Sequence, residues 1–180
     1  SYSPNKGKGA ALKFAFDYAQ KHNFDYAITI DADGQHFASD LPLFFDAIEK
    51  DYGAMIVGSR FLKQENMPAG NTFANKFSNF WFTVQTGKKL ADTQTGYRAY
   101  PLFKMGKMRS FSKRYESELE YLQRMAWRNI KIVSIPIQVY YAPEGQRVSH
   151  FRKGRDFTRI SVLNTLMCFV AILYGYPSMF

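Results

Sequence analysis

The segment Asp31-Ala32-Asp33-Gly34-Gln35-His36 carries the residues best suited to chemistry. It follows Asp25–Ile30, a run of β-branched and aromatic residues that predicts a buried strand. Residues two apart face the same side of an extended chain, so Asp31 and Asp33 can converge on one cation, with Gln35 continuing the row. Carboxylate and carboxamide oxygens are hard ligands that suit Mg²⁺ or Mn²⁺. Taken alone, the segment is better explained as an Asx turn at the end of a strand.

Three further polar segments accompany it. Asn5-Lys6-Gly7-Lys8-Gly9 opens a predicted helix, where free N–H groups favour an anion, although the spacing of a P-loop is missing. Gly58-Ser59-Arg60 ends a second predicted strand, and an arginine there can pair with a phosphate through two N–H groups. Asp92–Arg98 precedes a third strand. Each segment alone also fits a plain role: a glycine-rich helix start, a surface salt bridge or a capped turn.

Hydrophobic periodicity predicts the elements that position these segments. Helices are expected over Lys8–His22, Asp40–Lys50, Asn71–Lys89 and Glu116–Arg128, and strands over Asp25–Ile30, Ala54–Gly58, Thr95–Tyr100 and Ile130–Tyr141. This alternation indicates an α/β fold with a mostly parallel sheet flanked by helices, whose ligands bind at the carboxyl ends of the strands. Pro136 places the last strand at an edge or bulge. The helical spacing of one aromatic stripe predicts a core face: Phe73, Phe77, Phe80, Trp81 and Val84.

Composition narrows the class of protein. The 180 residues include 24 Lys+Arg against 15 Asp+Glu, a net charge of +9, so phosphate, nucleic acid or an anionic membrane is the expected partner; a merely basic soluble protein stays open. Hydrophobic residues make up 46% of the chain, which excludes general disorder. Cys168 is the single cysteine, which excludes a disulfide framework and a thiolate zinc site and fits a reducing compartment.

The C-terminal part has its own pattern. Ile160–Tyr174 is mostly apolar but shorter than the ~20 residues of a spanning helix. It follows a basic cluster: Arg147, Arg152, Lys153, Arg155 and Arg159. The pattern fits a helix at a membrane interface and a core helix equally well. We therefore divide the chain into a domain over 1–146 and a basic segment with an apolar, membrane-associated or core helix over 147–180.

The order of the motifs resembles the family-2 glycosyltransferases of GT-A fold, in particular the polyprenyl-phosphate (dolichyl-phosphate-type) mannosyl- and glucosyltransferases. Asn5–Leu12 is similar to their Asn-x-Gly-Lys-Gly-x-Ala stretch, Asp31–His36 to their metal-binding Asp-x-Asp motif, and Gly58–Arg60 to their Gly-Ser-Arg. Asp92–Arg98 is similar to their Asp-x-x-(Ser/Thr)-Gly-(Phe/Tyr)-Arg segment. Further matches in the same order are Arg114–Glu118, Ile135–Ile137 and Ser149–Phe151. No single motif is specific to the family, but the seven motifs in this order are. The resemblance extends from Asn5 to about Asn164.

The resemblance implies a Rossmann-like GT-A enzyme that moves a sugar from a UDP- or GDP-linked nucleotide-sugar to a polyprenyl phosphate. Mg²⁺ or Mn²⁺ held by Asp31, Asp33 and Gln35 then bridges the donor diphosphate. The residues expected to assist in binding that diphosphate are Lys6, Gly7, Lys8 and Gly9. The enzyme is expected to be cytoplasmic and to lie on, or be anchored at, an anionic membrane surface.

The acceptor decides which residues catalyse transfer. A phosphate oxygen is ionised near neutral pH and needs no strong base, but it needs positive charge, which Arg60 and Arg98 can supply. A sugar hydroxyl as acceptor needs a carboxylate base instead, with Asp92 as first candidate and Glu116 or Glu118 behind it. Asp92 and Arg98 are accordingly the catalytic candidates.

Two other classes of protein stay open. A nucleotidyltransferase shares a paired-aspartate metal site, and a non-catalytic module could bind anionic lipid or nucleic acid. Nucleic acid is not expected as a partner, because the aromatic residues have core spacing and no nucleic-acid motif is present. The family also begins with a strand and an acidic-glycine segment that hold the nucleotide, and these are missing ahead of Asn5. Either the natural protein is longer or this chain alone cannot bind a donor, and we expect the longer protein.

Overall fold

The computed structural model describes residues 7–60, 69–107, 116–141 and 153–179. Its elements are α1 (Lys8–Lys21), β1 (Tyr26–Thr29), the 3-10 helix η1 (Ala38–Asp40), α2 (Leu41–Lys50), β2 (Met55–Arg60), α3 (Ala69–Thr86), β3 (Arg98–Pro101), α4 (Leu102–Met105), α5 (Glu116–Trp127), β4 (Ile132–Ile137), α6 (Lys153–Val170), the π-helical turn η2 (Ala171–Gly175) and the 3-10 helix η3 (Pro177–Met179). The predicted helices and strands are all present, with ends shifted by a few residues. The α/β class is therefore confirmed.

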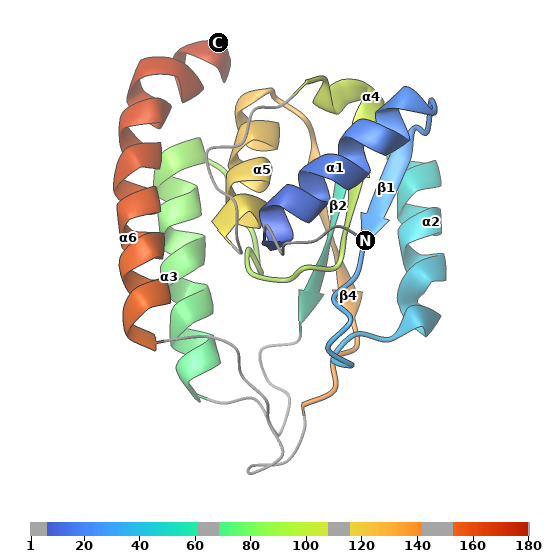
Figure 1. Cartoon of the computed structure of the whole chain (residues 1–180), viewed down its shortest axis with the longest axis horizontal. Helices are drawn as coiled ribbons and strands as arrows, with labels where there is room; N and C mark the ends of the chain where they lie inside the picture. The colour runs from blue at the N-terminus through green and yellow to red at the C-terminus, as the bar shows by residue number, and fades with distance from the viewer. Residues whose placement is uncertain (1–6, 61–68, 108–115, 142–152, 180) are drawn as a thin grey trace.

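The sheet is mixed. Its strand order is β1-β3-β2-β4, with β3 antiparallel to β1 and β2, and β2 parallel to β4. β1, β2 and β4 therefore point the same way (Figure 1), while β3 points the other way. The expectation of a mostly parallel sheet holds for strand direction but not for pairing, since two of the three pairings are antiparallel. β4 lies at an edge, where Pro136 costs no ladder hydrogen bond on its open side.

The reversed β3 brings distant segments to one edge. Arg98, at the start of β3, lies opposite Thr29 near the end of β1 and opposite Val57 of β2. The loop ahead of β3 consequently meets the carboxyl ends of β1 and β2. A parallel β3 would instead have placed Asp92–Tyr97 at the far edge of the sheet.

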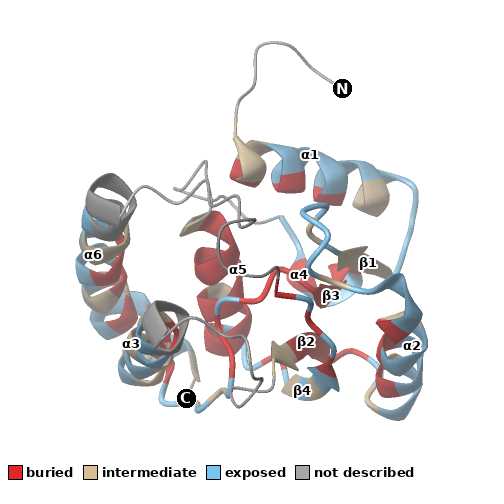
Figure 2. Cartoon of the chain, turned by 90° about the horizontal axis from the view of Figure 1, so that it is seen from below, coloured by how far each residue is buried: buried red, intermediate tan, exposed pale blue. Residues whose placement is uncertain are grey.

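Helices cover both faces of the sheet. On one face, Phe16 of α1 and Leu122 of α5 pack with Met55, Val57 and Tyr100 of the strands. On the other face, a second core joins α2 to the sheet; it includes Phe44, Ile56, Ala99 and Ile137. α5 is buried along nearly its whole surface, because α1, α3 and α6 lie around it (Figure 2).

The aromatic stripe of α3 is not core, and that prediction was wrong. Phe73 and Phe80 are 68% and 58% exposed, whereas Asn75, Ser78 and Gln85 are buried together with Phe82. The polar face is turned inward because α5 and α6 offer it polar partners. Gln85 Nε2 donates to the Asn164 carbonyl oxygen of α6 at 3.0 Å, and Gln85 Oε1 accepts from Nε2 of Gln123 of α5. Trp127 Nε1 donates to the Gln85 carbonyl oxygen at 2.8 Å.

α6 lies beside α3 and also contacts α5 through a small apolar cluster. Leu163, Met167 and Ala171 form a cluster with Trp127. The opposite side of α6 and η2 is exposed and apolar, including Val162, Phe169 and Leu173. Among the described helices, none is long and apolar enough to cross a bilayer.

Candidate functional site

The acidic loop follows β1, at the edge where β1 and β2 end. Asp33 is exposed, and its Oδ1 accepts from the backbone N–H of Gln35 at 3.0 Å, which is an Asx turn. The Gln35 carbonyl oxygen accepts from the N–H of Tyr140 at 2.9 Å, and His36 forms a β-bridge with Val139. The contacts with Tyr140 and Val139 therefore hold the loop against the extension of β4. The exposed Gln35 side chain and one oxygen of Asp33 face solvent.

Asp31 is joined to two helices. Lys8 Nζ, at the first residue of α1, forms an ion pair with Asp31 Oδ1 and a second with Glu118 Oε2 of α5 at 2.9 Å. Gly7 precedes the helix with φ 92°, a backbone conformation that favours glycine. Burial lowers the pKa of Lys8, but Glu118 and Asp31 together outweigh it, so that pKa lies above its ordinary value. Burial raises the pKa of Glu118, although Arg98 and Lys8 oppose that rise.

Gly96, in the loop before β3, makes room for Asp31. A Cβ at Gly96 would overlap the carboxylate of Asp31, so the missing side chain forms the wall against which this carboxylate lies. Asp31 already holds one cationic group, the ammonium of Lys8, and Asp33 is open to solvent. These hard oxygen ligands fit a divalent cation that completes its coordination with substrate phosphates. Within the described residues, no group of three or more His, Cys, Asp or Glu could hold a metal by itself.

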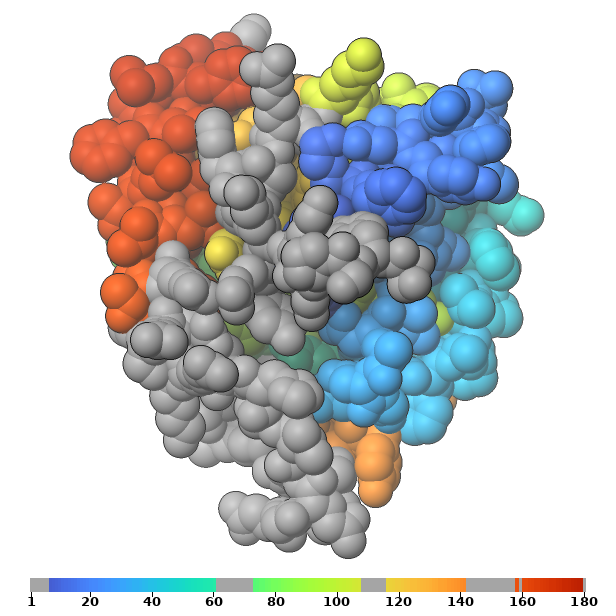
Figure 3. Space-filling model, viewed as in Figure 1, coloured from blue at the N-terminus to red at the C-terminus, as the bar shows by residue number. Residues whose placement is uncertain are grey.

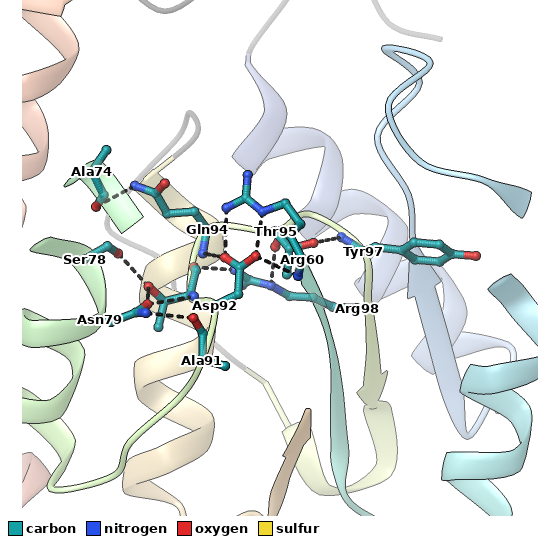
Figure 4. A network of polar contacts seen from close by, with 11 residues as sticks. Arg60, Ala74, Ser78, Asn79, Ala91, Asp92, Gln94, Thr95, Tyr97 and Arg98 are labelled. Carbon is teal, nitrogen blue, oxygen red and sulfur yellow. Dashed lines mark hydrogen bonds and ion pairs between the residues drawn. The ribbon is translucent and has the colours of Figure 1, made fainter. Parts of the chain in front are cut away.

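Arg60 and Asp92 form one buried ion pair (Figure 4). Arg60 Nε and Nη2 donate to the two carboxylate oxygens at 2.6 and 2.9 Å, and the backbone N–H groups of Arg60 and Gln94 add bonds at 3.2 and 3.0 Å. Asp92 is 0% exposed. Burial lowers the pKa of Arg60, but Asp92 and Tyr141 together raise it by more. The pair fastens the loop before β3 to the end of β2.

Arg98 lies in the interior, 1% exposed. Its guanidinium donates to the carbonyl oxygens of Thr95, Thr93 and Glu118 at 2.7, 2.8 and 2.6 Å. The structure thus places it beneath the loop and the first turn of α5, where it holds backbone. We assign Arg98 this structural role instead of the expected contact with an acceptor phosphate.

His36 lies between the groups named so far. Burial, and to a smaller extent Arg60, lower the pKa of His36. The carboxylates of Asp31, Asp33 and Asp92 oppose this but do not outweigh it. Its imidazole lies beside the ring of Tyr97, with centroids 5.5 Å apart, and its buried Nδ1 has no hydrogen-bond partner among the described groups. The charges of four groups from the loop after β1, the end of β2 and the loop before β3 therefore act on His36, whose pKa lies below its ordinary value.

The sequence left two features of this site unassigned. Glu118 was a reserve base, and nothing predicted its ion pair with Lys8, because the amphipathic pattern of this helix predicts exposed glutamates, whereas Glu118 is buried. Gly96 was part of a motif without a stated role. Gly7 precedes α1 and Gly9 is buried within it, and their contact with an anion stays a prediction. Glu116 begins α5 and is half-buried. Lys6, Arg114–Tyr115 and Ser149–Phe151 lie outside the described residues.

Known proteins match the chain over most of its length. One relative is a UDP-N-acetylglucosamine–dolichyl-phosphate N-acetylglucosaminyltransferase of Methanococcus voltae, 30% identical over 145 residues, which are 78% of this chain and 58% of that protein. Another is a polyprenol monophosphomannose synthase of Mycolicibacterium smegmatis, 29% identical over 138 residues, 73% of this chain and 51% of that protein. The chain thus spans little more than half the length of these relatives.

A solved structure shares the fold. Glucosyl-3-phosphoglycerate synthase from Mycobacterium tuberculosis, in complex with Mn²⁺ and UDP-glucose, superposes with a TM-score of 0.63 at 14% identity, covering 93% of this chain and 56% of that one. The family model for glycosyl transferase family 2 matches residues 2–114. With a model that matches more than half of its residues and a relative 30% identical over 78% of its length, the chain belongs to glycosyl transferase family 2.

Proposed function

We propose that this chain is the larger part of a glycosyltransferase that moves a sugar from a UDP- or GDP-linked donor to a polyprenyl phosphate, assisted by Mg²⁺ or Mn²⁺ on Asp31 and Asp33. The names of the two relatives, a dolichyl-phosphate and a polyprenol enzyme, support this acceptor class. The fold neighbour that holds Mn²⁺ with UDP-glucose supports the donor and the metal.

The hydrogen bonds that the Asp92 carboxylate accepts are the observation that favours one acceptor over the other. A carboxylate has about four lone-pair positions, and four donors from Arg60 and Gln94 reach the oxygens of Asp92. No position is left to take a proton from a sugar hydroxyl. An acceptor that is already ionised needs no such base, and a lipid phosphate is one. This favours polyprenyl phosphate over the sugar-hydroxyl alternative.

Named residues then divide the work. Asp31 and Asp33, with Gln35 nearby, hold the cation, which neutralises charge on the leaving diphosphate. Lys8 and the start of α1 supply positive charge to the same anion. Arg60 has five N–H donors; two reach Asp92, and Tyr141 also lies against the guanidinium, so the donors that remain can bind the acceptor phosphate. Asp92 orients Arg60.

The proposal also places the protein on the cytoplasmic side of a membrane, where the acceptor's phosphate lies. Its support is the apolar outer surface of α3, α6 and η2, joined to a net charge of +9. An interfacial helix combines such a surface with basic residues.

The decisive experiment is transfer by the full-length protein from UDP- and GDP-sugars to a polyprenyl phosphate and to soluble sugars, with Asp33→Asn as the variant. We expect lipid-linked product and a loss of at least about 10-fold for Asp33→Asn, the smaller end of effects seen around metal sites. Asp46→Asn, on the exposed face of α2, is the matched control and should stay active. Transfer to soluble sugars alone, or an unimpaired Asp33→Asn, would contradict the proposal.

A further inference from the structure

Lys8 lies between two carboxylates that come from distant parts of the chain. Its Nζ pairs with Asp31 of the loop after β1 and with Glu118 of α5, and all three side chains are largely shielded, at 25%, 30% and 9% exposed. Lys8 therefore occupies a cation position on Asp31, the same carboxylate that our proposed function gives to the metal. The inference below rests on that function.

Among the described residues, the charges that act on Lys8 and Glu118 balance without any metal. Glu118 also faces Arg98, whose guanidinium donates to the Glu118 carbonyl oxygen. Two cationic and two anionic side chains thus form one neutral group. A divalent cation that enters alone brings two further positive charges next to the Lys8 ammonium, in a partly buried place where repulsion is poorly screened. A cation that enters with a diphosphate brings compensating negative charge.

Two observations separate this group from a purely structural salt bridge. Lys8 is the first residue of α1, whose first turn holds no acidic residue, and a cation at a helix N-terminus opposes the helix dipole. Glu118 is 7% exposed, yet its Oε1 has no hydrogen-bond partner among the described groups. A network that served stability alone is expected to satisfy such an atom.

We infer that Lys8 is a positioning residue that competes with the divalent cation for Asp31. Once the cation and the donor diphosphate have displaced the Lys8 ammonium from Asp31, Glu118 keeps that ammonium in the site. Lys8 then moves from Asp31 to the diphosphate. The metal and the donor consequently bind together, and the metal binds weakly by itself.

The test measures Mn²⁺ binding to full-length protein by the loss of the free-Mn²⁺ electron paramagnetic resonance signal, with and without UDP or GDP. Lys8→Met removes the charge, and Lys8→Gln removes the charge but keeps an N–H donor for Glu118. A hydrogen bond to a charged group is lost from Asp31, so both variants should bind Mn²⁺ alone roughly tenfold more tightly than the wild type. With nucleoside diphosphate present, the gain should disappear, because the anion loses a positive partner.

Lys13→Met is the matched control, since Lys13 lies on the same helix but pairs with Asp17 on the surface. It should bind Mn²⁺ as the wild type does. If the wild type binds Mn²⁺ with the nucleotide and the folded Lys8 variants bind Mn²⁺ alone no more tightly, the competition is refuted while the metal site stands. If no sample binds Mn²⁺ under any condition, the proposed metal site fails, and the inference fails with it.

Discussion

At the scale of single residues, the ion pair of Arg60 and Asp92 changes how the site can be tested. Their motifs predicted opposing roles for these residues, a phosphate ligand for one acceptor and a base for the other. The structure joins them through two short hydrogen bonds, with Asp92 fully buried. A variant of either residue therefore disturbs both, and loss of activity alone cannot distinguish the two acceptors.

Arg60→Ala should lower the free energy of unfolding by about 3–5 kcal/mol, because it leaves the buried carboxylate of Asp92 without its partner. The double variant Arg60→Ala/Asp92→Leu should lose much less stability than the sum of the single variants Arg60→Ala and Asp92→Leu, since no unpaired charge remains. Urea denaturation of the four proteins measures this coupling.

Lys131→Met is the control for that cycle. It removes the ion pair of Lys131 with Asp51, in which the lysine is 65% exposed, and should cost about 0–1 kcal/mol. Additive effects of Arg60→Ala and Asp92→Leu would show that the pair is not a unit.

At the scale of elements, periodicity predicted which segments form helices and strands, but not how they are turned. The run Thr95–Tyr100 has the same apolar pattern in a parallel and an antiparallel strand, so the direction of β3 could not be predicted. The candidate loops were found because their motifs are local. The pairs Arg60–Asp92 and Lys8–Glu118 depend on which strand and helix become neighbours, and no local pattern contains that information.

The orientation of α3 failed for a related reason. An amphipathic pattern defines two faces, and the apolar one normally packs inward. Here the polar face can be buried because Gln85 finds partners in Gln123 and Asn164. Those partners are 38 and 79 residues away along the chain, so the aromatic face of α3 looks like core in the sequence.

This inverted helix predicts an inverted response to mutation. Gln85→Leu should destabilise the protein by about 1–3 kcal/mol, because it leaves buried polar groups of α5 and α6 without partners. Phe80→Gln should change stability by no more than about 0.5 kcal/mol, since Phe80 is exposed. Thermal unfolding followed by circular dichroism compares the two. A neutral Gln85→Leu with a damaging Phe80→Gln would mean that α3 is turned the other way.

At the scale of the whole molecule, α3, α6 and η2 together carry many exposed apolar side chains. α3 and α6 lie side by side (Figure 1), and α6 with η2 forms the orange-red flank of the space-filling view (Figure 3). The exposed residues on these elements are Phe73, Phe80, Val84, Val162, Leu166, Phe169, Ile172, Leu173 and Tyr174. A large exposed apolar patch marks a binding surface, and the basic residues that precede Ile160 in the sequence make an anionic membrane its proposed partner.

The double variant Phe169→Ser/Leu173→Ser should therefore weaken binding to vesicles that contain anionic lipid. Each side chain is worth about 1.5–3 kcal/mol when it leaves water, so the partition coefficient should fall roughly tenfold or more for each. Phe14→Ser is the matched control, because Phe14 is 62% exposed, as Phe169 is 61%, but lies on α1, separated from α6 by α5. Sedimentation with vesicles at low and high salt measures both parts of the interaction, since the electrostatic share weakens as salt rises and the apolar share does not. Equal binding by all three proteins would mean that this flank does not face the membrane, and its apolar residues would then need a protein partner.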